Sequence, residues 1–130
     1  MSVQPTAMTS MIDCARQIAP SLRARADEVE AARRIPDDLA RSLADQGFYR
    51  MWVPKRLGGL ELPLAPSLEV FEVLAKADPS VAWCVAIAVS STLALPHLPE
   101  STAKTIFDRP DRVIDCLLYT SDAADDTPCV

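Results

Sequence analysis

The chain has 130 residues, of which 49% are hydrophobic and 5% aromatic, with three glycines and a formal net charge of −5. This composition predicts one domain of packed helices, and the acidic balance without a basic run argues against a nucleic-acid partner. Four widely separated cysteines and a single histidine give neither zinc-site spacing nor a disulfide framework, and residues 1–9 do not resemble a secretory signal, so we expect a cytoplasmic protein.

The first predicted element is helical and runs from Ala7 to about Arg34. Its apolar residues recur at spacings of three and four as far as Leu22, after which the apolar stripe thins and the opposite face is strongly charged. Pro20 lies inside this pattern and predicts a kink or two consecutive helices. The charged face predicts a solvated surface, with a docking surface for another domain or subunit as the alternative.

A second helix is predicted to begin near Pro36 and to end before Gly47. Proline fits the first turn of a helix, and Asp37 and Asp38 carry charges that favour the positive end of the helix dipole. Glycine just past the last turn can adopt the left-handed conformation that ends many helices. The predicted buried stripe consists of Leu39, Leu43 and Ala44.

Residues 48–63 form the connection that follows, because their apolar side chains no longer keep helical spacing. Gly58-Gly59 supplies positions where a positive φ is cheap or where the backbone approaches something closely. The pair lacks both the Gly-x-Gly-x-x-Gly and the Gly-Lys-Ser/Thr spacing, so it is not a nucleotide-binding loop.

Two further helices are predicted on either side of the longest uncharged stretch. Residues 67–77 form the first, which is mostly apolar and carries one polar stripe of Glu69, Glu72 and Lys76. The second is short and runs from Glu100 to about Phe107. Residues 112–114 are predicted to begin an extended segment.

The stretch between Asp78 and Glu100 holds 21 residues without a formal charge. Asp78 can cap a helix and Pro79 fits its first position, which predicts a helix from Pro79 to about Leu95. This helix is apolar around its circumference and must lie in a core or a bilayer. Its prolines and the lack of flanking Lys or Arg clusters favour a central buried helix over a membrane span.

The last fifteen residues differ in character from the rest, with three acids and no base. Residues 116–126 resemble the conceptual translation of a transposase sequencing adapter. We therefore expect residues 1–115 to form the helical domain of a truncated parent and residues 116–130 to be a non-native tail, with a natural acidic tail as the alternative.

No set of residues in the chain can carry a reaction unaided, since His97 is the only imidazole and lies between prolines. Trp83, Ile87 and Ser91 share one face of the predicted central helix, with Ser90 beside them. An indole and a hydroxyl on a buried face need hydrogen-bond partners or a ligand. One interpretation is core packing, with the serine bonded to a carbonyl one turn back. The other is a wall of a flavin or substrate pocket.

Three segments in this order resemble the N-terminal helical domain of the acyl-CoA dehydrogenase superfamily: residues 34–48, the Val-Pro-x-x-x-Gly-Gly motif at 53–59, and residues 77–83. The resemblance extends over about residues 15–114. It implies an all-α, acyl-CoA dehydrogenase N-terminal-domain-like helical bundle with a central buried apolar helix. It also implies an intact parent with a middle β domain and a C-terminal helical bundle, usually a homotetramer that binds FAD.

In that family the catalytic base and most flavin contacts lie in the two later domains, so the resemblance implies no catalytic residue in this chain. The candidates for a flavin or substrate pocket are Trp83, Ser90 and Ser91. The implied parent is an oxidoreductase that removes hydrogen beside the activated carbonyl of an acyl-CoA, with flavin as the hydride acceptor. The chain alone is expected to be inactive and to retain no flavin, whether FAD or FMN.

The Asp78-x-Ser80-x-x-Trp83 pattern is more similar to the branch of flavin-dependent monooxygenases that share this fold and act on small aromatic substrates. In that branch a histidine often stands eight residues after the tryptophan, where this sequence has Ser91. Dehydrogenase and monooxygenase both stay open. A third hypothesis, from a different class, is a non-catalytic helical interaction module.

Overall fold

The computed structural model describes residues 5–114, and this part of the chain is helical without any strand. The all-α prediction is confirmed. The α-helices are α1 (Pro5–Ala24), α2 (Ala26–Ala32), α3 (Asp37–Asp45), α4 (Leu64–Ala77), α5 (Pro79–Ser90) and α6 (Glu100–Ile106). The 3-10 helices are η1 (Phe48–Arg50), η2 (Lys55–Leu57) and η3 (Ser91–His97). The predicted non-native tail, 116–130, lies outside the described residues.

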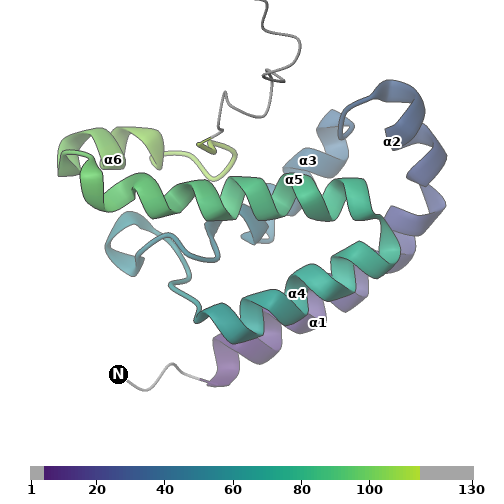
Figure 1. The fold of residues 1–130 in the computed structure, drawn as a ribbon, viewed down its shortest axis with the longest axis horizontal. Helices are drawn as coiled ribbons and strands as arrows, with labels where there is room; N and C mark the ends of the chain where they lie inside the picture. Colours follow the sequence, from purple (N-terminus) through teal and green to yellow (C-terminus); the bar gives the residue numbers. More distant parts are fainter. Residues whose placement is uncertain (1–4, 115–130) are drawn as a thin grey trace, which may run out of the picture.

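Helices α1, α4 and α5 form the body of the fold (Figure 1). α1 packs along α4, and a sharp turn at Asp78 sends α5 back against α4. α2 and α3 lie near the start of α5, whereas α6 lies at the far end of the same helical rod, beyond η3 (Figure 1). The long uncharged stretch is therefore the axis that joins the two ends of the molecule.

The N-terminal helical region consists of two consecutive helices, as predicted, but the break is not at the proline. α1 continues through Pro20 and ends at Ala24. The guanidinium of Arg25 then bonds to Glu28 at 2.7 Å and to Asp38 on α3 at 2.7 Å. These bonds connect the junction between α1 and α2 to the start of α3.

The main core is one continuous set of buried side chains that includes residues of α1, α2, α3, η1, α4 and α5. Spacings of three and four place the apolar stripe of each helix on this core, as the sequence predicted for α1 and α3. Its fully buried members include Ala15, Leu22, Leu43, Phe48, Leu74 and Val85.

The glycine pair of the connection is needed for two different reasons. Gly58 has a φ of +78° and ends η2 in the left-handed conformation. A Cβ on Gly59 would lie 1.9 Å from the carbonyl oxygen of Val53, so only glycine fits there. Both roles that the sequence allowed for this pair are therefore present. The loop closes on itself through bonds from Gly59 N to Pro54 O and from Glu61 N to Val53 O.

The central helix differs from its prediction in length and in burial. α5 ends at Ser90, and the chain continues as the tighter η3 to His97. Val81, Val85 and Val89 are fully buried, whereas Trp83 is 59% exposed on the opposite side. The predicted central helix is therefore buried on one face and exposed at Trp83 within the described part of the chain. An apolar helix is expected to be buried by other parts of the protein, but its composition does not identify which segments pack against it.

One helical segment of the described chain, Pro79–His97, is long and apolar enough to span a membrane by length and composition. It has 19 residues and a mean hydropathy of 1.5, and 39% of the window is buried within the protein. A core helix passes the same test. The contacts of α5 with α4 and η1 are those of a core helix.

Candidate functional site

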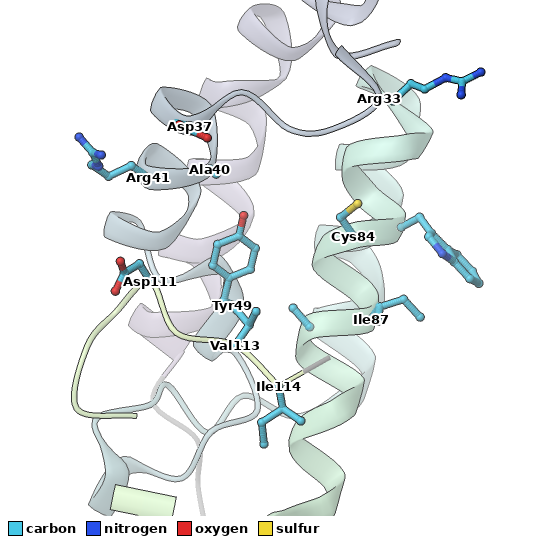
Figure 2. A pocket seen from close by; sticks show the side chains of 12 residues that line it. Arg33, Asp37, Ala40, Arg41, Tyr49, Cys84, Ile87, Asp111, Val113 and Ile114 are labelled. Carbon is cyan, nitrogen blue, oxygen red and sulfur yellow. The ribbon is translucent and has the colours of Figure 1, made fainter. Parts of the chain in front are cut away.

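A groove of about 870 Å³ lies between α3, α5 and the segment 111–114 (Figure 2). We call it the Tyr49 groove. Its lining residues are Arg33, Asp37, Ala40, Arg41, Tyr49, Trp83, Cys84, Ile87, Ala88, Asp111, Val113 and Ile114. Three separate parts of the chain therefore build three walls around one aromatic residue.

The α5 wall is a stripe of four residues, Trp83, Cys84, Ile87 and Ala88, at the spacing of one helix face. The Asp78 carboxylate fixes the start of this helix, because its Oδ1 accepts a hydrogen bond from the Val81 N–H at 3.0 Å. This cap confirms the predicted helix start. The wall thus begins from a firmly held first turn.

Charged side chains surround the mouth of the groove. Asp37 pairs with Arg34 at 3.7 Å, and Asp111 pairs with Arg109 at 2.6 Å, so both acids are partly neutralised. Arg33 and Arg41 have no ion pair among the residues that the structure describes. The lining therefore contains two arginines and two aspartates, and Arg33 and Arg41 are the cations available to an anionic ligand group.

Tyr49 is 9% exposed, and its ring points into the space between α3 and α5 (Figure 2). The turn at Gly47, with a φ of +85°, is followed by Phe48 and Tyr49, which both belong to the main core, and Tyr49 also lines the groove. Burial, with a smaller contribution from Cys84, raises the pKa of Tyr49 to about 12. No hydrogen bond of its hydroxyl is present among residues 11–114, whose side chains the structure describes. Because of the raised pKa, the groove contains a protonated donor at neutral pH.

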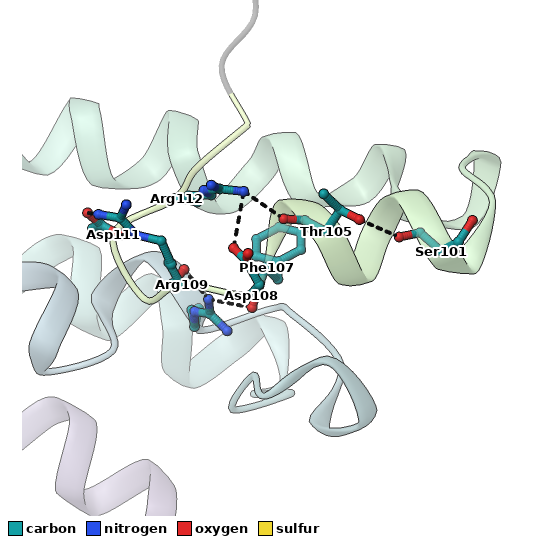
Figure 3. Close-up of polar contacts among 8 residues, drawn as sticks. Ser101, Thr105, Phe107, Asp108, Arg109, Asp111 and Arg112 are labelled. Carbon is teal, nitrogen blue, oxygen red and sulfur yellow. Dashed lines mark hydrogen bonds and ion pairs between the residues drawn. The ribbon is translucent and has the colours of Figure 1, made fainter.

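The third wall follows α6 and is held by polar contacts (Figure 3). The Arg112 guanidinium donates to the carbonyl oxygen of Thr105 at 2.8 Å and pairs with Asp108 at 3.1 Å. Arg109 pairs with Asp111 through both carboxylate oxygens. Ile114 packs against a small apolar cluster, whereas Val113 is 42% exposed. This wall contains few apolar contacts.

The structure brings only one of the three predicted pocket residues to the groove. Trp83 lines it together with Ile87. Ser90 donates to the carbonyl oxygen of Ile87 at 3.1 Å, as the core-packing interpretation expected, and does not line the groove. Ser91 is half-buried where α5 becomes η3, also outside the lining. Their part in a flavin or substrate pocket stays a prediction.

Most of the groove was missed by reasoning from the sequence. Tyr49 had one available signal, an aromatic residue directly after a glycine stop and a core phenylalanine. The residues 111–114 had none, because they reach α5 only through the fold. No group of three or more His, Cys, Asp or Glu within the described part of the chain could hold a metal ion.

Comparison with known proteins places the chain in a family. Residues 10–101 match the family described as acyl-CoA dehydrogenase, N-terminal domain. An indole-3-acetate monooxygenase of Acinetobacter baumannii is 36% identical over 92 residues, which are 71% of this chain and 23% of the relative. One from Pseudomonas putida is 35% identical over 104 residues, 79% of this chain and 26% of the relative.

A third relative is the oxygenase component of p-hydroxyphenylacetate 3-hydroxylase of Acinetobacter baumannii, 33% identical over 78 residues, 60% of this chain and 18% of the relative. The chain spans about a quarter or less of the length of these curated relatives. The family match covers most of the chain, and the resemblance in its motifs is confirmed. The chain therefore belongs to the acyl-CoA dehydrogenase superfamily, in which it corresponds to the N-terminal helical domain.

Proposed function

We propose that the complete protein is the oxygenase of a flavin-dependent monooxygenase and that this domain forms one wall of its flavin and substrate site. The observation that carries the proposal is the position of Trp83, which is 59% exposed on the α5 wall of the Tyr49 groove. An exposed indole beside the aliphatic side chain of Ile87 is a surface on which a flavin ring or an aromatic substrate packs favourably.

The α5 wall fits a flavin ring but not a flavin phosphate. α5 offers an indole and aliphatic side chains and carries no cation, so this helix could pack against a planar ring without holding a phosphate. We therefore expect the isolated chain to retain no flavin, and FAD and FMN are both compatible with the wall. Bound reduced flavin supplies the two electrons with which one atom of O₂ enters the substrate and the other leaves as water.

The part of this chain in such a reaction is to position the substrate and to exclude water. Ile87 and Ala88 provide an apolar surface, and the Tyr49 hydroxyl is a neutral hydrogen-bond donor inside the groove. Arg33 and Arg41 at the mouth favour a substrate with an anionic group. All three relatives described above are named for aryl acetates, which supports a small aromatic acid as the substrate.

An acyl-CoA dehydrogenase is the second candidate, and Ser91 favours it. The position that often carries a histidine in the monooxygenase branch is a serine here. A serine hydroxyl cannot exchange a proton near neutral pH as an imidazole does. All three relatives described above are nevertheless monooxygenases or hydroxylases, so we place this candidate second.

The test is to read the source locus past codon 115 and to express the complete reading frame with reduced flavin, O₂ and aryl acetates. Hydroxylated product is expected, and the Trp83→Ala variant should lower kcat/KM by about tenfold or more through lost packing on the ring. Leu93→Ala is the matched control, because Leu93 is similarly exposed, at 66%, but lies outside the groove.

Two results would contradict the monooxygenase. Anaerobic reduction of the flavin by an acyl-CoA would identify a dehydrogenase instead. A natural stop codon near residue 115, with no following β domain, would favour the interaction module. Homotetramer assembly of the complete protein, which we also propose, is measured separately by light scattering.

A further inference from the structure

Arg50 is a buried charge outside the walls of the groove. Its side chain is on η1, and the residue is 8% exposed. A buried charge is unfavourable unless it is well hydrogen-bonded, and burial lowers the pKa of Arg50. No carboxylate within residues 5–114 forms a salt bridge with it, although Asp108 and Asp111 oppose the pKa shift. The position of this arginine therefore needs another explanation.

The guanidinium joins two parts of the chain through carbonyl oxygens. Nη1 donates to Leu57 O at 3.2 Å, and Nη2 donates to Phe107 O at 2.9 Å and to Arg109 O. The centre of the guanidinium also lies 5.5 Å from the centroid of the Phe107 ring. The last carbonyls of a helix have no partner within the helix, so Arg50 acts as a C-terminal cap for α6.

The loop is shaped to leave room for this guanidinium. A Cβ on Gly58 would lie 3.2 Å from Nη1 of Arg50, closer than an ordinary contact. The Nε of Arg50 is buried without a partner among the described residues, so only the outer nitrogens hold the group in place. The planar guanidinium of arginine can donate to Leu57 O and Phe107 O through two different nitrogens at once. The single ammonium group of a lysine is less suited to do this.

The direction in which the chain leaves α6 decides where the third wall of the groove lies. The carbonyls of Phe107 and Arg109 are bound to Arg50, and residues 111–114 follow directly. We propose that Arg50 is a positioning residue that caps α6 and thereby holds Asp111, Val113 and Ile114 in place as the third wall of the Tyr49 groove. This assignment deepens the proposed function, on which its importance for substrate binding rests.

The experiment compares Arg50→Met, Arg50→Lys and the control Arg56→Met in the full 130-residue chain. Arg56 is exposed on η2, six residues away. In Arg50→Met the amides of residues 107–114 should exchange at least about tenfold faster, because several hydrogen bonds to charge are lost. The methyl resonances of Val113 and Ile114 should move toward random-coil values, while those of the main core stay in place.

The lysine variant and the core resonances separate positioning from general stability. Arg50→Lys should restore part of the Val113 and Ile114 shifts, and Arg56→Met should change neither. Unchanged shifts in Arg50→Met would overturn the proposal, as would equal changes throughout α1, α4 and α5. If Arg50→Met does not fold, the lysine variant decides by the same two criteria. No flavin or substrate takes part, so a failure here leaves the oxygenation test unaffected.

Discussion

Two regions of the molecule are stabilised by different kinds of interaction. The main core of α1, α3, α4 and α5 is a continuous apolar cluster. The end lobe, formed by η2, η3 and α6, has a small cluster of Val53, Leu57, Leu95, Ala103 and Phe107 beside the buried guanidinium of Arg50. Stability scales with apolar area buried, so most of it resides in the main core.

The Tyr49 groove lies where these regions meet. Its α3 and α5 walls belong to helices of the main core, whereas its third wall follows the end lobe. Regions with few buried apolar contacts open more easily than the rest of a fold. The comparison therefore indicates a groove with two firm walls and one that depends on local polar contacts.

The largest expected effect is in the main core, at Leu74 of α4. Its side chain is fully buried, so Leu74→Ala should lower the free energy of unfolding by about 3 kcal/mol. Urea unfolding followed by far-ultraviolet circular dichroism measures this change. Leu68→Ala on the same helix is the control, because Leu68 is 54% exposed and should change stability by less than about 0.5 kcal/mol. Similar losses for both variants would contradict the assignment of the core.

The end lobe should respond locally to a substitution of comparable size. Phe107 is 5% exposed, and in a main core its replacement by alanine would cost about 3–5 kcal/mol. The global loss for Phe107→Ala should instead be below about 2 kcal/mol, because the lobe can open without the rest of the fold. Hydrogen exchange of residues 100–114 should accelerate. A global loss as large as that of Leu74→Ala would show that the two regions unfold as one.

The same division separates what the sequence predicts from what it does not. The Asp78 cap, the Gly47 stop and the Gly58-Gly59 turn depend on groups within a few residues, and their chemistry is readable locally. The hydrogen bonds from Arg50 to Phe107 and Arg109 have sequence separations of 57 and 59. Contacts over such a separation cannot be predicted from the periodicity of the sequence.

The candidate site shows the same limit. Trp83 was predicted as a pocket residue from its helix face, but the exposure of that face depends on which segments cover it. Tyr49 enters the groove because Gly47 turns the chain and α5 passes opposite, and only the first of these is local. Sequence reasoning therefore reached one wall of the groove and not the other two.

The smallest expected effect is a pH dependence at Tyr49, which reports on how well the groove is closed. Burial raises its pKa from about 10 in an unfolded chain to about 12. Both states are protonated below about pH 10, and above it the unfolded state loses its proton first. Stability contributed by this residue is therefore present below pH 10 and lost as the pH rises toward 12. At about pH 11 the loss should be roughly 1 kcal/mol, which Tyr49→Phe should abolish.

The measurement is the difference in unfolding free energy between the wild type and Tyr49→Phe at about pH 8 and about pH 11. An identical pH dependence in both proteins would mean that Tyr49 is open to water.

A second comparison, between the double variant Tyr49→Phe, Phe107→Ala and Phe107→Ala alone, tests the contribution of the third wall. Release of residues 111–114 should hydrate the phenol and return its pKa toward its ordinary value, so the pH-dependent difference should shrink. A difference that persists in full would show that α3 and α5 alone bury Tyr49, and that the third wall does not contribute to closing the groove.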